Sequence, residues 1–374
     1  MRARQTWSRS RRRRRGAPRP VWPLIALALA GAAAAVLATR RRGERADRAD
    51  RADRWGDGSA HPGPGEAGNA RAGRAARPSS DWRDLDDETP EAEEAVAAAE
   101  PAQLWIAGPA GNLYVRDSGE IGGGGRLPVL FVHGLAGNGG QWALQLDHLR
   151  RRRRALALDL RGHGESDPAD AAGPGGPAGP GQDRPYAIES LAADVAAVAD
   201  HFALRHFVLA GHSLGAAVGI AYAAAHPERV AGLLLVDPNG DQTRIPRAQI
   251  EPFLAALRVE PLRELEAYYR QLVAGADRDA ARLVLEDLRL TAEDAVAPAI
   301  AAAVEFAPLP ALARYGGPRL AVISQANSLP YSLHNLLPEL PVQLLRGTGH
   351  WLMMDRPEAF NRVLDGFLDL LEGP

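Results

Sequence analysis

Leu209-Ala210-Gly211-His212-Ser213-Leu214-Gly215 is an apolar run that ends in Gly-x-Ser-x-Gly and precedes a helix-forming stretch of small residues. This spacing is typical of a nucleophile elbow, in which a buried strand turns sharply into a helix and holds the serine above the sheet edge. Glycine suits positions 211 and 215 because a side chain there would crowd the turn against neighbouring backbone. Ser213 is therefore the candidate nucleophile, although glycine and serine also form ordinary turns.

Three further motifs accompany this run. Upstream, the apolar residues 127–132 precede His133-Gly134, the pattern of a buried strand that enters a turn. An Asp-x-Arg-Gly-His-Gly-x-Ser motif follows at 159–166, and a late Gly-x-Gly-His motif at 347–350 places a histidine in a glycine-rich loop. In this order the four motifs resemble the α/β-hydrolase family, and the resemblance covers residues 102–372.

Short apolar runs and longer helical patterns alternate between these motifs. Strand-like runs occupy 129–133, 155–159, 206–211 and 230–236, and helical patterns lie near 140–150, 187–203 and 214–225. The alternation predicts an α/β fold, with a mostly parallel sheet and helices on both of its faces. A hairpin-like pair at 104–106 and 113–115 opens the domain.

The strand pattern stops for about 80 residues after the run at 230–236. Four amphipathic segments fill this interval, at 251–257, 262–273, 279–288 and 295–304, and a strand returns at 319–323. In the α/β-hydrolase family an insertion at this place resembles a helical cap over the active site. We therefore expect a cap at about 240–317, and its apolar lining would select the substrate.

The resemblance implies a serine mechanism with a base, an orienting acid and an oxyanion hole. His350 is expected to take the proton of Ser213, because serine is a poor nucleophile without a base. Backbone N–H groups of Leu135 and Leu214 would hold the oxyanion. Structural or supporting roles are expected for two other motif histidines, His163 and His212.

The orienting acid departs from the pattern usual in the family. The loop after the strand at 319–323 carries Asn327 where an aspartate is most often found, and no carboxylate precedes Glu339. Some family members place the acid one strand earlier, where this chain has Asp237, although Val-Asp-Pro is also a common turn at a strand end. We predict Asp237 as the acid and keep a dyad supported by Asn327 as the alternative. Two other aspartates, Asp159 and Asp241, are less favoured.

These residues predict a serine hydrolase that cleaves a carboxylic ester or related acyl bond in a small molecule through an acyl-enzyme. The alternative is a non-catalytic binding or sensor protein with a degenerate triad. Neither a metal nor a cofactor is expected, since the sequence shows no metal-binding cluster and no phosphate loop. The chain has 374 residues, a net charge of −2 and no cysteine. The small negative net charge disfavours nucleic-acid binding, and the absence of cysteine excludes thiol chemistry. The sequence does not indicate an oligomeric state.

The N-terminal region carries a separate signal. Nine arginines between Arg2 and Arg19 precede eighteen uncharged residues at 21–38, and arginines resume at 40–42. A helix of this length spans roughly 27 Å, enough for a membrane anchor with the later domain outside the cytoplasm. A cleaved signal that releases a secreted domain is the alternative. The domain prediction is a basic segment with an anchor at 1–42, a linker at 43–100 and the hydrolase domain at 101–374.

Overall fold

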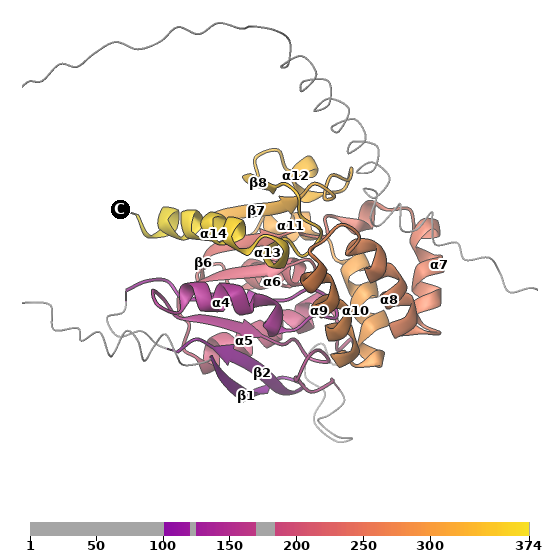
Figure 1. Ribbon diagram of the computed structural model, residues 1–374, viewed down its shortest axis with the longest axis horizontal. Coiled ribbons are helices and arrows are strands. Elements are labelled where there is room, and N and C mark those ends of the chain that lie inside the picture. The colour runs from indigo at the N-terminus through magenta and orange to yellow at the C-terminus, as the bar shows by residue number, and fades with distance from the viewer. Residues whose placement is uncertain (1–100, 120–124, 170–183, 374) are drawn as a thin grey trace, which may run out of the picture.

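The computed structural model describes residues 101–119, 125–169 and 184–373, which form one eight-stranded sheet with helices around it (Figure 1). The strand order is β1-β2-β4-β3-β5-β6-β7-β8. The strands are β1 (Ala102–Gly108), β2 (Gly111–Asp117), β3 (Val129–Val132), β4 (Ala155–Leu158), β5 (Phe207–His212), β6 (Val230–Val236), β7 (Arg319–Ser324) and β8 (Val342–Leu345).

The sheet is mostly parallel, as the sequence predicts. β2 is antiparallel to both of its neighbours, β1 and β4, and the pairings from β4 through β3 to β8 are parallel. The central strands read as continuous apolar runs because each is covered on both faces. Parallel strands bring their carboxyl ends to one edge, so the loops after β3, β5, β6, β7 and β8 gather there.

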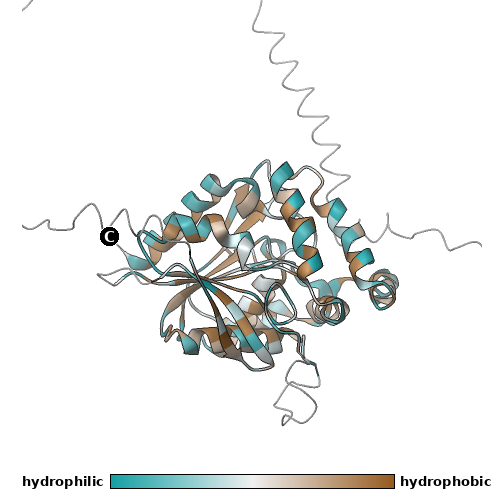
Figure 2. Cartoon of the chain, turned by 60° about the horizontal axis from the view of Figure 1, so that its bottom comes forward, coloured by the Kyte–Doolittle hydropathy of each residue, from teal (hydrophilic) through white to brown (hydrophobic). Residues whose placement is uncertain are grey.

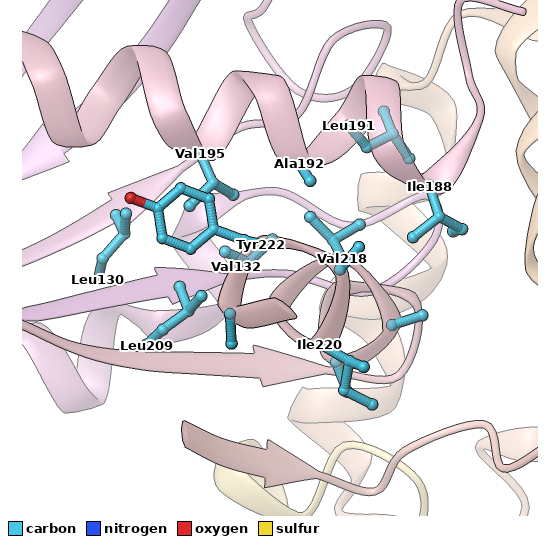
Figure 3. Packing of buried hydrophobic residues seen from close by; sticks show 14 of the residues in the cluster. Leu130, Val132, Ile188, Leu191, Ala192, Val195, Leu209, Val218, Ile220 and Tyr222 are labelled. Carbon is cyan, nitrogen blue, oxygen red and sulfur yellow. The ribbon is translucent and has the colours of Figure 1, made fainter. Parts of the chain in front are cut away.

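Helices cover the two faces of the sheet, and alternate residues of each strand serve the two layers. α5 (Ile188–His201) and α6 (Leu214–Ala225) pack on the face that carries Leu130, Val132 and Leu209, and Figure 3 shows these side chains interlocking with those of the two helices. α4 (Ala143–Leu149) and α14 (Pro357–Glu372) pack on the opposite face, against Val129 and Phe131. The α/β-hydrolase arrangement predicted from the motifs is therefore present.

Between β6 and β7, a stretch that the structure describes throughout, the chain forms helices that stand at one side of the sheet (Figure 1). They are the 3-10 helix η2 (Gln242–Arg244), α7 (Arg247–Leu257), α8 (Pro261–Leu272), α9 (Arg278–Asp287), the 3-10 helix η3 (Leu288–Leu290) and α10 (Glu293–Glu305). Figure 2 shows polar and apolar sides on these helices. A further helix, α11 (Pro308–Leu312), packs against α6 and so joins the layer that covers the sheet.

Short elements complete the chain near the sheet edge. They are the 3-10 helix η1 (Gly139–Trp142), α12 (Leu333–Leu336) and α13 (Leu352–Asp355). Among the residues that the structure describes, no helix combines the length and the hydropathy needed to cross a membrane. The predicted anchor or signal at 21–38 and the predicted linker at 43–100 lie outside the described residues.

Candidate active site

Ser213 occupies a strained turn between β5 and α6, with φ 53° and ψ −112°. A positive φ with this ψ lies outside the regions that a residue with a Cβ normally adopts, and it costs on the order of 1–3 kcal/mol. The surrounding backbone enforces the turn: a Cβ on Gly211 would lie 2.1 Å from the carbonyl oxygen of Gly215, and a Cβ on Gly215 would lie 2.4 Å from that of Val132. Both glycines are thus required, and they allow the sharp turn that holds Ser213 at the end of β5.

His350 lies in the loop after β8, and its Nδ1 is 2.7 Å from Oδ2 of Asp237, the residue that follows β6. Asp237 is 2% exposed and the His350 side chain is 18% exposed. The hydrogen bond fixes the orientation of the imidazole ring and leaves its Nε2 for another partner. Nε2 of His212, the residue before Ser213, lies 2.9 Å from the His350 carbonyl oxygen, so His350 is beside the strained turn.

Other groups hold the Asp237 carboxylate in place. The backbone N–H of Ser324 donates to Oδ1 at 2.8 Å and its hydroxyl donates to Oδ2 at 3.1 Å. Asn327 donates from Nδ2 to Oδ1 at 3.2 Å and to the Pro238 carbonyl oxygen at 2.9 Å. The sequence leaves a choice between Asp237 and Asn327. In the structure Asp237 contacts His350, and Asn327 contacts Asp237.

The two less favoured aspartates face other partners. Asp159 accepts hydrogen bonds from Arg116 at 2.9 Å, from Gly139 N–H at 2.6 Å and from Glu165 N–H at 3.0 Å. It thus joins the loops after β3 and β4. Asp241 forms an ion pair with Arg244 at 3.0 Å. Neither contact involves His350.

Asn239 is a site residue that the sequence analysis missed. The Ser213 hydroxyl donates to Oδ1 of Asn239 at 2.9 Å, so in this conformation the serine proton points to the amide. Asn239 lies two residues after Asp237 in the turn that leaves β6. The only available signal was its place in that turn, because no spacing rule links it to the serine 26 residues earlier.

The two predicted oxyanion donors lie on either side of Ser213. Leu214 is the first residue of α6, where backbone N–H groups have no partner within the helix and carry the positive end of its dipole. Leu135 follows β3, the neighbour of β5 in the sheet. A Cβ on Gly134 would lie 3.2 Å from that of Ser213, which shows how near this loop approaches the serine.

Three buried histidines surround these groups. Burial lowers the pKa of His133 to about 4 and that of His163 to about 3, and it lowers the pKa of His212 well below the usual value. These rings are neutral near pH 7 and serve as hydrogen-bond partners of the backbone. For example, Leu160 N–H donates to Nε2 of His133 at 3.0 Å, so the proton of that ring is on Nδ1.

A carboxylate ties the helices from η2 to α10, hereafter called the cap, to the loop that carries His350. Asp355 accepts hydrogen bonds from the backbone N–H of Gly349 at 2.6 Å and from that of Asp277 at 2.9 Å. Asp277 is the N-cap of α9 in the cap, and Gly349 precedes His350. Burial raises the pKa of Asp355. The position of His350 is therefore connected to the position of the cap.

No cluster of metal-ligating side chains occurs in the part of the chain that the structure describes. A groove of about 790 Å³ lies between the β7–β8 edge and α14, lined in part by Arg319, Val363 and Phe367. Its lining includes none of Ser213, Asp237 or His350. The arrangement around Ser213 contains a hydroxyl, an imidazole hydrogen-bonded to a carboxylate, and backbone N–H groups.

Comparison with known proteins agrees with this fold. Residues 128–264 match the model of the alpha/beta hydrolase fold family. A thermophilic esterase from Thermogutta terrifontis has a solved structure similar to this one, with a TM-score of 0.57 and 22% identity, covering 73% of this chain and 100% of the esterase. The chain has the α/β-hydrolase fold.

Relatives in sequence include hydrolases. The 2-(acetamidomethylene)succinate hydrolase of Mesorhizobium japonicum is 26% identical over 273 residues, which cover 69% of this chain and 92% of that enzyme. The dihydrolipoyllysine-residue acetyltransferase component of the acetoin cleaving system of Pseudomonas putida is 30% identical over 261 residues, or 67% of this chain. The chain spans 65% of the length of that relative.

Proposed function

We propose that this protein is a serine hydrolase that cleaves a carboxylic ester or related acyl bond in a small molecule, with Ser213, His350 and Asp237 as its catalytic residues. The observation that carries the proposal is the 2.7 Å contact between His350 Nδ1 and Asp237 beside a serine held in a strained turn. A structural histidine has no need of a buried carboxylate at this place, whereas a general base that becomes positively charged does. The esterases and hydrolases among similar proteins support the same reaction class.

The proposed reaction has two stages. His350 Nε2 takes the Ser213 proton as the serine oxygen bonds to the acyl carbon, and the backbone N–H groups of Leu135 and Leu214 stabilise the oxyanion. The protonated His350 then gives its proton to the leaving alcohol as the acyl–oxygen bond breaks. Water, activated by the same ring, hydrolyses the acyl-enzyme and releases the acid. Asp237 stabilises the imidazolium in both stages.

The contact with Asn239 adds one requirement to this reaction. The Ser213 hydroxyl points to Asn239 Oδ1, so it must turn to Nε2 of His350 before the attack. The alternative of a non-catalytic binding protein was motivated by the missing acid near Asn327. The contact that gives His350 a carboxylate partner favours the hydrolase over that alternative.

A fluorophosphonate probe tests the proposal directly. We expect the purified wild-type protein to be labelled at Ser213, because only an activated serine reacts rapidly with such a probe. The same protein should hydrolyse p-nitrophenyl acetate or butyrate. Heat-denatured protein is the control for nonspecific labelling. A folded protein that shows neither labelling nor hydrolysis on a broad ester panel would favour the binding-protein alternative.

The N-terminal sequence supports a further proposal about location. We expect the full-length protein to sediment with membranes and its hydrolase domain to be digested by protease only from the extracytoplasmic side, because arginines flank the apolar segment 21–38 most heavily on its N-terminal side. A variant that lacks residues 21–38 should remain in the cytoplasm. A mature N-terminus near Thr39 would indicate signal cleavage instead, and soluble full-length protein in the cytoplasm would contradict both alternatives.

A further inference from the structure

The loop after β3 is held in a strained form. Ala136 in this loop has φ 47° and is fully buried, although it carries a Cβ. The Gly134 carbonyl oxygen accepts hydrogen bonds from His133 Nδ1 at 2.6 Å and from Gly137 N–H at 3.2 Å. A trans peptide is planar, so these bonds to the Gly134 carbonyl direct the N–H of Leu135 to the opposite side. One of the two peptide units that meet at Leu135 is thereby fixed.

The second peptide unit is fixed from the cap. The Tyr269 hydroxyl, on α8, donates a hydrogen bond to the Leu135 carbonyl oxygen. Tyr269 is 4% exposed, and burial raises the pKa of its hydroxyl well above the usual value, so the group stays protonated and acts as a donor. Since this bond holds the carbonyl between Leu135 and the strained Ala136, it opposes a flip of that peptide.

The Tyr269 ring also contacts the other side of the site. Its centroid is 5.2 Å from the Trp351 ring at an interplanar angle of 68°. Trp351 in turn lies 5.1 Å from the His350 ring and 5.8 Å from the His212 ring. One side chain of the cap therefore touches the loop of a proposed oxyanion donor and the neighbour of the proposed base.

We propose that Tyr269 is a positioning residue, through which the cap stabilises the strained loop that carries the Leu135 N–H and so supports the oxyanion hole. The inference rests on the proposed function, because it assigns a task to a donor of that mechanism. When α8 stays over the site, the hydrogen bond to Leu135 is made. When α8 moves away, the bond breaks and the strained loop loses one of its restraints, so the position of the cap affects how firmly the oxyanion hole is held.

Tyr269→Phe removes the hydroxyl and keeps the ring on Trp351. Loss of a whole oxyanion donor lowers kcat by about a hundredfold to a thousandfold, so loss of its support should lower kcat for p-nitrophenyl butyrate by about tenfold to a hundredfold. KM should change by about twofold or less, because the ring and the apolar surface remain. The affinity for a phenylboronic acid, which forms a tetrahedral adduct on the serine, should fall in parallel with kcat.

Tyr315→Phe is the matched control. Tyr315 is a fully buried tyrosine whose hydroxyl also contacts backbone carbonyls, those of Val230 and Pro318, each at 3.1 Å. Its partners Val230 and Pro318 lie at the amino ends of β6 and β7, whereas the loop after β3 leaves the carboxyl edge of the sheet. Loss of the Tyr315 hydroxyl should lower the melting temperature and leave kcat within about twofold of wild type. A merely structural role for Tyr269 would give the same result in both variants.

The outcomes separate the inference from the proposed function. If wild type is active and Tyr269→Phe keeps kcat and boronate affinity within twofold, the inference is wrong and the proposed function stands. If wild type is neither labelled nor active, both fail. A cavity could unfold Tyr269→Phe, so 4-fluorophenylalanine at position 269 provides a second variant that fills the space without donating. Its kcat should be as low as that of a folded Tyr269→Phe, and a wild-type kcat in this variant would also overturn the inference.

Discussion

We expect Ser213→Ala and His350→Ala each to lower kcat for p-nitrophenyl butyrate by about a thousandfold or more. Ser213→Ala removes the atom that bonds to the acyl carbon, and His350→Ala removes the group that takes its proton. The double variant should lose no more activity than either single variant, because the two side chains act as one unit. Steady-state kinetics and thermal melts on the three variants test this expectation.

His206→Ala is a matched control for the histidine. His206 is exposed and precedes β5, so its removal should leave both kcat and the melting temperature unchanged. Unchanged turnover in Ser213→Ala or His350→Ala would remove that residue from the mechanism. Additive losses in the double variant would show that the two residues act in separate steps, contrary to the proposal.

The parts of the site that could be predicted from sequence are those that depend on local backbone geometry. The Gly-x-Ser-x-Gly spacing predicts the turn at Ser213 because only glycine fits where a Cβ would lie 2.1 Å or 2.4 Å from a carbonyl oxygen. The alternation of apolar runs likewise predicts the order of strands and helices. Each of these signals is contained within a few neighbouring residues.

The partner of His350 could not be decided from sequence because it depends on how two neighbouring loops turn. Val236 pairs with Val322 in the sheet, so Asp237 and Asn327 both lie in loops that leave the same edge. Asp237 takes a positive φ of 43°, and Val-Asp-Pro, although common in turns at strand ends, does not indicate where that turn directs the side chain. In the structure the Asp237 carboxylate contacts Nδ1 of His350, and Nδ2 of Asn327 donates a hydrogen bond to the same carboxylate.

The contacts made by the cap could not be predicted from the sequence either. Helical periodicity predicts a helix over 262–273 and an apolar side, and α8 spans Pro261–Leu272. It does not predict which loop that side will meet. Tyr269 reaches Leu135 across 134 residues of sequence, and its partner is a backbone carbonyl that carries no residue signature. The Pro308–Leu312 segment illustrates the same limit, because it packs on α6 although it follows the cap helices directly.

The second large effect concerns Asp237, and we expect Asp237→Asn to lower kcat on the order of ten-thousandfold while preserving the fold. The surrounding donors explain the size of this effect. Ser324 N–H and Asn327 Nδ2 both point to Oδ1, so an asparagine at 237 would keep its oxygen there and turn its NH₂ to His350. Nδ1 of His350 would then have to accept, which puts the ring proton on Nε2. A ring in that tautomer cannot take the Ser213 proton.

Two further variants test whether Asp237 is the residue that orients His350. Asn327→Ala removes one of the four donors to the Asp237 carboxylate, so its kcat/KM should fall by about tenfold or less. In the double variant Asp237→Asn with Asn327→Asp, the new carboxylate at position 327 can accept a hydrogen bond from the NH₂ group of Asn at position 237. The amide oxygen of that asparagine is then free to face His350, which keeps the ring proton of His350 on Nδ1. This double variant should regain about tenfold or more over Asp237→Asn, although an amide stabilises imidazolium less well than a carboxylate. Near-wild-type kcat/KM in a folded Asp237→Asn variant would contradict the role of Asp237. It would favour Asn327 as the partner of His350, or a dyad of Ser213 and His350 alone.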